Sequence, residues 1–156
     1  MKAYKVYEFV NPRDHRRGGL KKDLKITKSY WTLEPGDLIQ PKRNMGLTRS
    51  SGKVTATHSG VYINKDSLLL ITKDLDIDSK TRKFWYIQIY PSLIKNNKIT
   101  FDYIKELQAM LKDKSLTQLQ KSKNLYSVKH YGSYFRNYPL LMKEKQFNNR
   151  FEFVTI

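Results

Sequence analysis

Cysteine is absent from this 156-residue chain, and acidic residues are few. Without cysteine the protein has no disulfide, no thiolate nucleophile and no cysteine-ligated zinc, so packing and hydrogen bonds must hold the fold. No apolar run reaches the roughly 18 residues that cross a bilayer, and no charged-then-apolar leader opens the chain. The sequence therefore predicts a cytoplasmic protein with neither a membrane segment nor an export signal.

Signals for metals and cofactors are equally scarce. The three histidines stand apart, without the HExxH or HxxxH spacing of zinc sites. Asp74, Asp76 and Asp78 imitate the start of a calcium loop, but Ser79 and Trp85 occupy the positions that need glycine and glutamate. No glycine-rich nucleotide-binding motif is present. We therefore expect neither a metal nor a cofactor.

Positive charge is what the chain has in excess. Its 30 Lys and Arg outnumber 14 Asp and Glu, for a net charge of +16. Such an imbalance predicts a polyanionic partner. The 11 tyrosines are interleaved with the cations, an arrangement that suits pairing with phosphates and stacking of bases. Most tyrosines taken singly are nevertheless expected to complete the core with their hydroxyls at its rim.

The cations that we expect to bind RNA fall in two loops and one helix. The first loop surrounds a glycine pair, Gly18 and Gly19, that lets the backbone approach a ligand. The second loop spans residues 42–53, and two lysines lie on the exposed face of a polar helix near residue 122. The predicted RNA-binding residues are Arg13, Arg16, Arg17, Lys21, Lys22, Lys42, Arg43, Arg49, Lys53, Lys121 and Lys123.

Hydrophobic periodicity predicts an α+β fold in a single domain, residues 1–156. Alternating or β-branched apolar runs predict strands over residues 2–10, 38–40, 60–63, 67–72, 84–90 and 150–156. From residue 100 the period changes, and Phe101, Ile104, Leu107 and Leu111 predict an amphipathic helix. Capping-box spacing at residues 115 and 118 predicts a second helix. Residues 74–82 are expected to form a charged loop, and 130–149 an irregular segment with one short helix.

The segment HSGVYINKDSLLLITK, residues 58–73, carries the candidate chemistry. Its two apolar runs predict strands joined at residues 64–66 in a hairpin-like connection. Antiparallel pairing of these strands would bring His58 and Ser59 beside Thr72 and Lys73. All four side chains would then face one phosphate.

Metal-free RNA cleavage needs a base for the 2′-hydroxyl, an acid for the leaving 5′-oxygen and cations for the phosphorane. Histidine, with an ordinary pKa of about 6.5, makes His58 the natural proton carrier. Ser59 and Thr72 would hydrogen-bond the phosphate, Lys73 would neutralise it, and Tyr30 is placed to line the same mouth. The alternative is that His58 caps a strand edge, Thr72 pairs with backbone and Lys73 is solvated.

Two stretches resemble the ToxN and AbiQ endoribonuclease toxins of type III toxin-antitoxin systems. GVYINKDSLLLITK is similar to their strand, turn, strand and Thr/Ser-Lys segment, and YIKELQAMLKDKSLTQLQKSKNLYSV resembles the helix pair that follows. Together they cover roughly residues 60–130. The resemblance implies a compact, strongly bent antiparallel β-sheet or barrel core with packed helices, as in MazF and Kid.

The same resemblance implies an activity and partners. These toxins cleave messenger RNA and their own precursor antitoxin RNA without a metal, leave a 2′,3′-cyclic phosphate, and act in growth arrest or phage abortive infection. A small pseudoknotted RNA inhibits them and can bridge several protein copies. By position, the catalytic Thr/Ser-Lys segment falls on Thr72 and Lys73, and Tyr30 is the candidate for a catalytic tyrosine. His58 and Ser59 depart from the ToxN pattern and would suit a CptN-like or TenpN-like branch.

Two alternatives remain open. PGDLI followed by THSGVYI resembles the halves of papain-like murein endopeptidases, but that chemistry needs a cysteine nucleophile, which this chain lacks. A relative of these endopeptidases without the cysteine would be inactive and could act only as a binding module. The charge alone is also consistent with a non-catalytic nucleic-acid-binding module.

Overall fold

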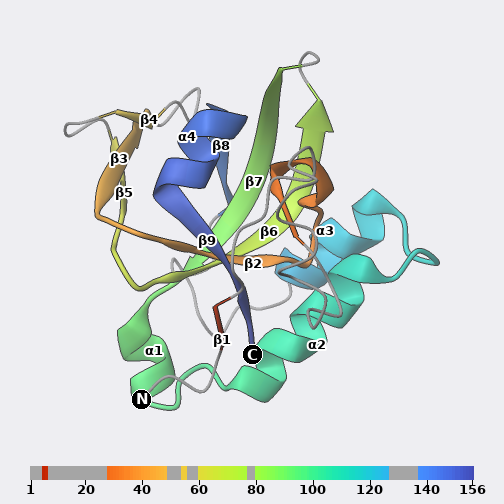
Figure 1. Cartoon of the computed structure of the whole chain (residues 1–156). Coiled ribbons are helices and arrows are strands. Elements are labelled where there is room, and N and C mark those ends of the chain that lie inside the picture. The colour runs from red at the N-terminus through yellow and green to blue at the C-terminus, as the bar shows by residue number, and fades with distance from the viewer. Residues whose placement is uncertain (1–4, 7–27, 49–53, 56–59, 77–79, 127–136) are drawn as a thin grey trace, which may run out of the picture.

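The computed structural model describes residues 5–6, 28–48, 54–55, 60–76, 80–126 and 137–156, and the structural statements below concern these residues (Figure 1). They form an α+β fold, as predicted from the sequence. In chain order the elements are β1 (Lys5–Val6), η2 (Tyr30–Thr32), β2 (Leu38–Pro41), β3 (Met45–Thr48), β4 (Val54–Thr55), β5 (Gly60–Ile63), β6 (Leu68–Asp76), β7 (Thr81–Ile89), α1 (Pro91–Lys95), α2 (Phe101–Lys112), α3 (Gln118–Tyr126), β8 (Asn137–Lys143), α4 (Glu144–Arg150) and β9 (Phe151–Thr155).

The strands form two antiparallel sheets. The larger has the order β1-β9-β2-β6-β7-β8 and the smaller the order β4-β3-β5. The chain leaves the larger sheet through residues 42–44 and returns through residues 64–67. Among the described residues, the edge strands β1 and β8 do not pair with one another, so the larger sheet is open and no closed barrel forms. The similarity to MazF and Kid stays a prediction.

One face of the larger sheet packs against the smaller sheet and α4. Leu47 and Ile63 of the smaller sheet meet Ile71 and Phe84 of the larger one, and Phe147 of α4 joins them. All five side chains are fully buried. The smaller sheet therefore folds over the larger one, because apolar side chains on both inner faces must leave water.

The opposite face of the larger sheet is covered by α1, α2 and α3. Ile104, Leu107 and Leu111 of α2 are buried against this face, which confirms the predicted amphipathic helix. The helix begins after Thr100, whose Oγ1 accepts a hydrogen bond of 3.1 Å from the Tyr103 N–H. These helices lie at the lower part of the sheet, while β6 and β7 extend beyond them (Figure 1).

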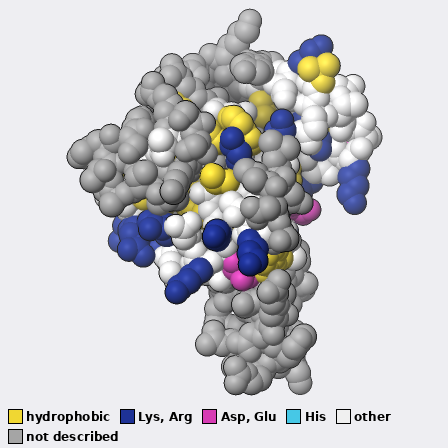
Figure 2. All heavy atoms as spheres, turned by 90° about the horizontal axis from the view of Figure 1, so that it is seen from above, with side chains coloured by type: hydrophobic (Ala, Val, Ile, Leu, Met, Phe, Trp, Pro, Cys, Tyr) yellow, Lys and Arg dark blue, Asp and Glu magenta, His cyan; other side chains and the backbone are white. Residues whose placement is uncertain are grey.

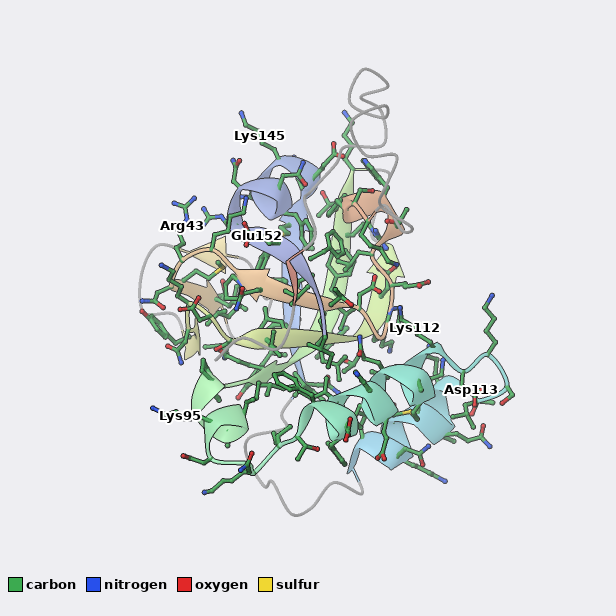
Figure 3. All side chains as sticks on the ribbon, turned by 60° about the horizontal axis from the view of Figure 1, so that its bottom comes forward. Arg43, Lys95, Lys112, Asp113, Lys145 and Glu152 are labelled. Carbon is green, nitrogen blue, oxygen red and sulfur yellow. The ribbon has the colours of Figure 1, made fainter. Side chains whose placement is uncertain are left out.

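A turn at residues 35–37 joins α2 to the sheet. Gly36 adopts a φ of +94°, which glycine tolerates and other residues rarely adopt. Gln108 Nε2 donates to the Gly36 carbonyl at 2.8 Å, and Lys112 Nζ lies 3.0 Å from Asp37 Oδ1. Figure 3 labels Lys112 at the end of α2 that faces this turn. The turn and the helix are therefore fixed to one another by polar contacts.

The second predicted helix exists but starts two residues later than expected. The capping box is formed by Thr117 and Gln120: Gln120 N–H donates to Thr117 Oγ1 at 3.2 Å, and Thr117 N–H donates to Gln120 Oε1 at 2.8 Å. Ser115 instead donates to Asp113 in the preceding turn. These bonds lower the pKa of the Asp113 carboxyl below its usual range.

The predicted hairpin of residues 60–72 is wrong. β5 pairs with β3 in the smaller sheet, whereas β6 pairs with β2 and β7 in the larger one. The connecting turn is closed by the Ser67 N–H and the Asn64 carbonyl at 3.2 Å, and Asp66 at its third position has a φ of +68°. This is the type II geometry, which splays the flanking strands instead of pairing them. The geometric reason for placing His58 and Ser59 beside Thr72 is therefore lost.

Two segments expected to be irregular are strands. The charged stretch 74–82 belongs largely to β6 and β7, where Asp74 and Arg82 neutralise one another on the same face. Residues 137–143 form β8, which is an edge strand of the larger sheet. An edge strand accommodates Pro139 because the backbone N–H that proline lacks is not required on the side of the strand that faces solvent. The short helix expected after Pro139 is α4, which begins at Glu144.

Candidate functional site: a bulge in the larger sheet

The predicted Thr72-Lys73 pair lies at an irregularity in the larger sheet. Ile71 of β6 pairs with Tyr86 of β7, and Lys73 pairs with the next residue, Trp85, so Thr72 is an extra residue in the ladder. Such a β-bulge bends the strand and re-aims its side chains, and bulges are frequent next to active sites. The Lys73 side chain is exposed to solvent.

Thr72 is held by a residue from the edge strand. Its Oγ1 donates to Oδ1 of Asn137 at 2.6 Å. Because β7 lies between β6 and β8, this hydrogen bond reaches across one strand. Only 4% of Thr72 is exposed, whereas Asn137 is exposed. Thr72 therefore fixes the bulge, and Lys73 is the group of the pair that can contact a ligand.

An aromatic ring and a second cation complete the site. Trp85 is the ladder partner of Lys73, so both side chains stand on one face of the sheet. Lys83 is two residues from Trp85 in β7, and its Nζ lies 5.6 Å from the indole centroid. Asn137 pairs with Ile87, which also lies on this face. We call Thr72, Lys73, Lys83, Trp85 and Asn137 the bulge cluster.

The side chains of the bulge cluster are suited to binding a nucleic-acid phosphodiester. Two lysines carry positive charge, and no member of the cluster carries negative charge to offset it. A partly exposed indole offers a surface for a base. The sequence did not identify Lys83, Trp85 or Asn137. Residues 84–90 were predicted as a strand without a functional role, Lys83 directly precedes them, and Asn137 is separated from Thr72 by 65 positions.

Comparisons with known proteins give no family for this chain. No family model, curated protein or solved structure matches it. In the described ranges, no group of three or more His, Cys, Asp or Glu side chains is placed to hold a metal ion. No helix in those ranges has the length and apolar character needed to cross a membrane. The candidate function therefore depends on the residues themselves.

Tyr30 belongs to the core, which corrects its assignment as a catalytic residue. Its side chain is 0% exposed, and its hydroxyl donates to the Met142 carbonyl at 2.8 Å. The ring packs against Trp31, Phe84 and Phe147 at centroid distances of 5.0 to 6.0 Å. Burial raises the pKa of Tyr30 to about 12, so the hydroxyl keeps its proton at neutral pH. A buried, protonated tyrosine can neither touch RNA nor act as its base.

Replacing Tyr30 with phenylalanine is therefore expected to change stability and not chemistry. The Met142 carbonyl would lose its donor in the core, which costs about 1–3 kcal/mol in free energy of unfolding. Urea denaturation measures this loss, and an RNA-cleavage assay on the same preparation measures activity. Retained stability together with lost cleavage would restore the catalytic assignment.

Three of the predicted RNA-binding cations also cap helices. Lys42 Nζ donates to the Asn148 carbonyl at 3.0 Å, and Arg43 donates to the Asn149 carbonyl at 3.4 Å, at the end of α4. Lys121 Nζ donates to the last turn of α2 at 2.8 Å. Cations at helix C-termini satisfy carbonyls that have no intrahelical partner and complement the helix dipole. Neutralising these residues would thus affect stability as well as RNA binding.

The surface around these caps is basic. Lys42, Arg43 and Lys123 are exposed, and Figure 3 shows Arg43 and Lys145 pointing away from the molecule beside α4. Figure 2 shows Lys and Arg side chains over the described surface of its view, with few acidic ones among them. The predicted residues outside the described ranges are His58, Ser59, Arg13, Arg16, Arg17, Lys21, Lys22, Arg49 and Lys53.

Proposed function

We propose that the chain is a metal-independent endoribonuclease, the toxin of a type III toxin-antitoxin system, and that a small structured RNA holds it inactive. The observation that carries the proposal is the position of Lys73. An exposed lysine follows the extra residue of a bulge, faces an aromatic ring and has a second lysine nearby. The same Thr-Lys segment resembles the catalytic segment of type III toxins.

In the proposed reaction, the 2′-oxygen of one nucleotide attacks the adjacent phosphorus. The new 2′-O–P bond forms as the P–O5′ bond breaks, which leaves a 2′,3′-cyclic phosphate and a free 5′-hydroxyl. A base takes the 2′-hydroxyl proton and an acid supplies a proton to the 5′-oxygen. Lys73 neutralises the charge that builds on the phosphorane, and Lys83 holds the neighbouring phosphate. The sequence predicts His58 as the proton carrier, but it lies outside the described residues and β5 does not pair with β6, so its part in this reaction is tested by the His58→Ala variant.

The bent core supports the MazF-like architecture that we propose. The smaller sheet folds over one face of the larger sheet, and helices cover only part of the other face. The bulge cluster stands on the face of the larger sheet that carries α1, α2 and α3. Lys73 is exposed on this face, so a polyanion would reach its ammonium group there.

The reaction is tested by the product that it leaves. Purified protein is incubated with excess EDTA and an RNA, and with the same RNA carrying a 2′-deoxy substitution at the mapped cleavage site. We expect cleavage of the all-ribose strand to a 2′,3′-cyclic phosphate, and no cleavage of the substituted strand, because the attacking group is missing. Cleavage at the 2′-deoxy site would exclude this chemistry, and binding without cleavage of either strand would favour the non-catalytic module.

Inhibition is tested separately. Addition of the transcript of a short tandem repeat encoded directly upstream of the reading frame is expected to abolish cleavage. A non-cognate RNA of equal length and charge is the matched control. Equal inhibition by both RNAs would reduce the effect to electrostatic competition, which is salt-dependent and not specific.

A further inference from the structure

An exposed tyrosine stands on the outer face of the smaller sheet, away from the bulge cluster. Tyr62 is 51% exposed, although its neighbours Val61 and Ile63 in β5 are buried in the core. Its partner in β3 is Gly46, which has no side chain to cover the ring. Half of the Tyr62 side chain is therefore accessible to a ligand from solvent.

The backbone beneath the tyrosine is rigidly held. Gln88 of β7 is 5% exposed, and its Nε2 donates to the Tyr62 carbonyl at 3.0 Å. The Oε1 of the same amide accepts from the Asn64 N–H at 2.9 Å. A buried amide from the larger sheet thus fixes the end of β5. The backbone that carries the Tyr62 ring is therefore preorganised, which reduces the backbone entropy lost when a ligand stacks on the ring.

Exposed cations lie on the two connections next to this end of β5. The two connections between the sheets meet here, because the Lys65 N–H donates to Asn44 Oδ1 at 2.6 Å. Lys42, Arg43 and Lys65 are exposed on these connections, with Asp66 as the acidic residue of the turn. Figure 3 shows Arg43 pointing outward at this end of the molecule, and Figure 1 places β3 and β5 on the side away from α2 and α3.

We infer that Tyr62 is a stacking platform for an unpaired nucleobase of single-stranded RNA, with Lys65 and Arg43 on the flanking phosphates. Base–aromatic stacking beside cations is how proteins hold single strands without reading a sequence. A base within a duplex keeps its own stacking partners and cannot use the ring. The inference rests on the proposed function for its choice of RNA, and it assigns a second contact point outside the bulge cluster.

The inference is tested by measuring the Kd for a fluorescent single-stranded RNA and for the corresponding duplex. All proteins in this experiment carry the Lys73→Ala substitution, which prevents cleavage. Tyr62→Ala is expected to raise Kd for the single strand about tenfold and leave duplex binding unchanged, and Tyr62→Phe is expected to bind as the parent does. The matched control is Leu119→Ala, which truncates the other large hydrophobic side chain that is exposed among the described residues, 66% exposed on α3. Circular dichroism checks that each variant is folded.

Salt dependence separates stacking from charge. Tyr62→Ala should keep the slope of log K against log salt, and Lys65→Gln should make it shallower by about one. Equal affinity of Tyr62→Ala and its parent for the single strand would overturn the inference, as would equal losses for single strand and duplex. If either result is found while the wild-type protein cleaves RNA, only the inference that Tyr62 is a stacking platform is rejected. If it neither cleaves nor binds RNA, the proposed function fails as well.

Discussion

Replacing Lys73 with alanine is expected to lower the rate of RNA cleavage by about 100- to 1,000-fold. The reason is geometric: Lys73 is exposed at the bulge, and it shares one face of the sheet with Trp85. Its charge would be felt most strongly in the transition state, where negative charge builds on the phosphorane. Single-turnover cleavage at saturating protein isolates the chemical step from binding.

Two comparisons give the Lys73 result its meaning. Lys105→Ala removes the same charge from an exposed position of α2 and should leave the rate unchanged. The single-turnover rate of His58→Ala, measured in parallel, tests whether the predicted proton carrier takes part in the same reaction. Cleavage by Lys73→Ala at the wild-type rate would remove the bulge cluster from the mechanism. A loss of affinity without a loss of single-turnover rate would make Lys73 a binding residue only.

The largest expected effect on stability belongs to Arg82. Its guanidinium is nearly buried, with 9% of the side chain exposed, and pairs with Asp74 of β6. It also donates to the carbonyls of Tyr30 and, at 2.8 Å, Leu33, and lies 4.7 Å from the Phe84 ring centroid. One side chain thereby ties the segment around η2 to the larger sheet.

Arg82→Leu should lower the free energy of unfolding by about 3–5 kcal/mol, because it removes the buried guanidinium that pairs with the Asp74 carboxylate and donates to two backbone carbonyls. The matched control is Lys83→Leu, one residue along β7 on the opposite, partly exposed face, where the loss should stay below about 1 kcal/mol. Urea denaturation followed by tryptophan fluorescence measures both. A loss below about 1 kcal/mol for Arg82→Leu would show that the buried ion pair is dispensable.

Helix α2 could be predicted from the sequence because its signals are local. Thr100 supplies the cap, and Ile104, Leu107 and Leu111 share a face at three- and four-residue spacing. The break and the second helix were also recognisable, although the capping box lies at Thr117 and not at Ser115. A donor and an acceptor three residues apart occur twice in this stretch, and sequence spacing does not distinguish them.

The strand pairing could not be predicted, because it depends on contacts far apart in the chain. Because β5 and β6 are neighbours in the sequence, we predicted that they pair. In the structure β5 pairs with β3, and the turn at Asp66 has a geometry that does not favour a hairpin. Tyr30 shows the same limit for the site. A tyrosine near cations suits catalysis as well as packing, and only the surrounding rings and the Met142 carbonyl assign it to the core.

The bulge cluster could be predicted only in part. Thr72 and Lys73 were recognised from residue type and resemblance, but the bulge is a property of register between β6 and β7. Asn137 comes from β8, an edge strand that the sequence did not indicate. From the sequence, Trp85 is expected to be a core residue in an aromatic run, whereas in the structure it is partly exposed.

The central claim, that this chain cuts cellular RNA at the bulge cluster, is tested most directly by mapping RNA 5′ ends in cells after induction. Wild-type protein and Lys73→Ala are expressed to equal levels, and new 5′-hydroxyl ends are counted along the transcripts. We expect new ends at recurring positions and growth arrest with the wild type, and neither with Lys73→Ala. New ends that persist unchanged with Lys73→Ala, or growth arrest without any new ends, would contradict the account.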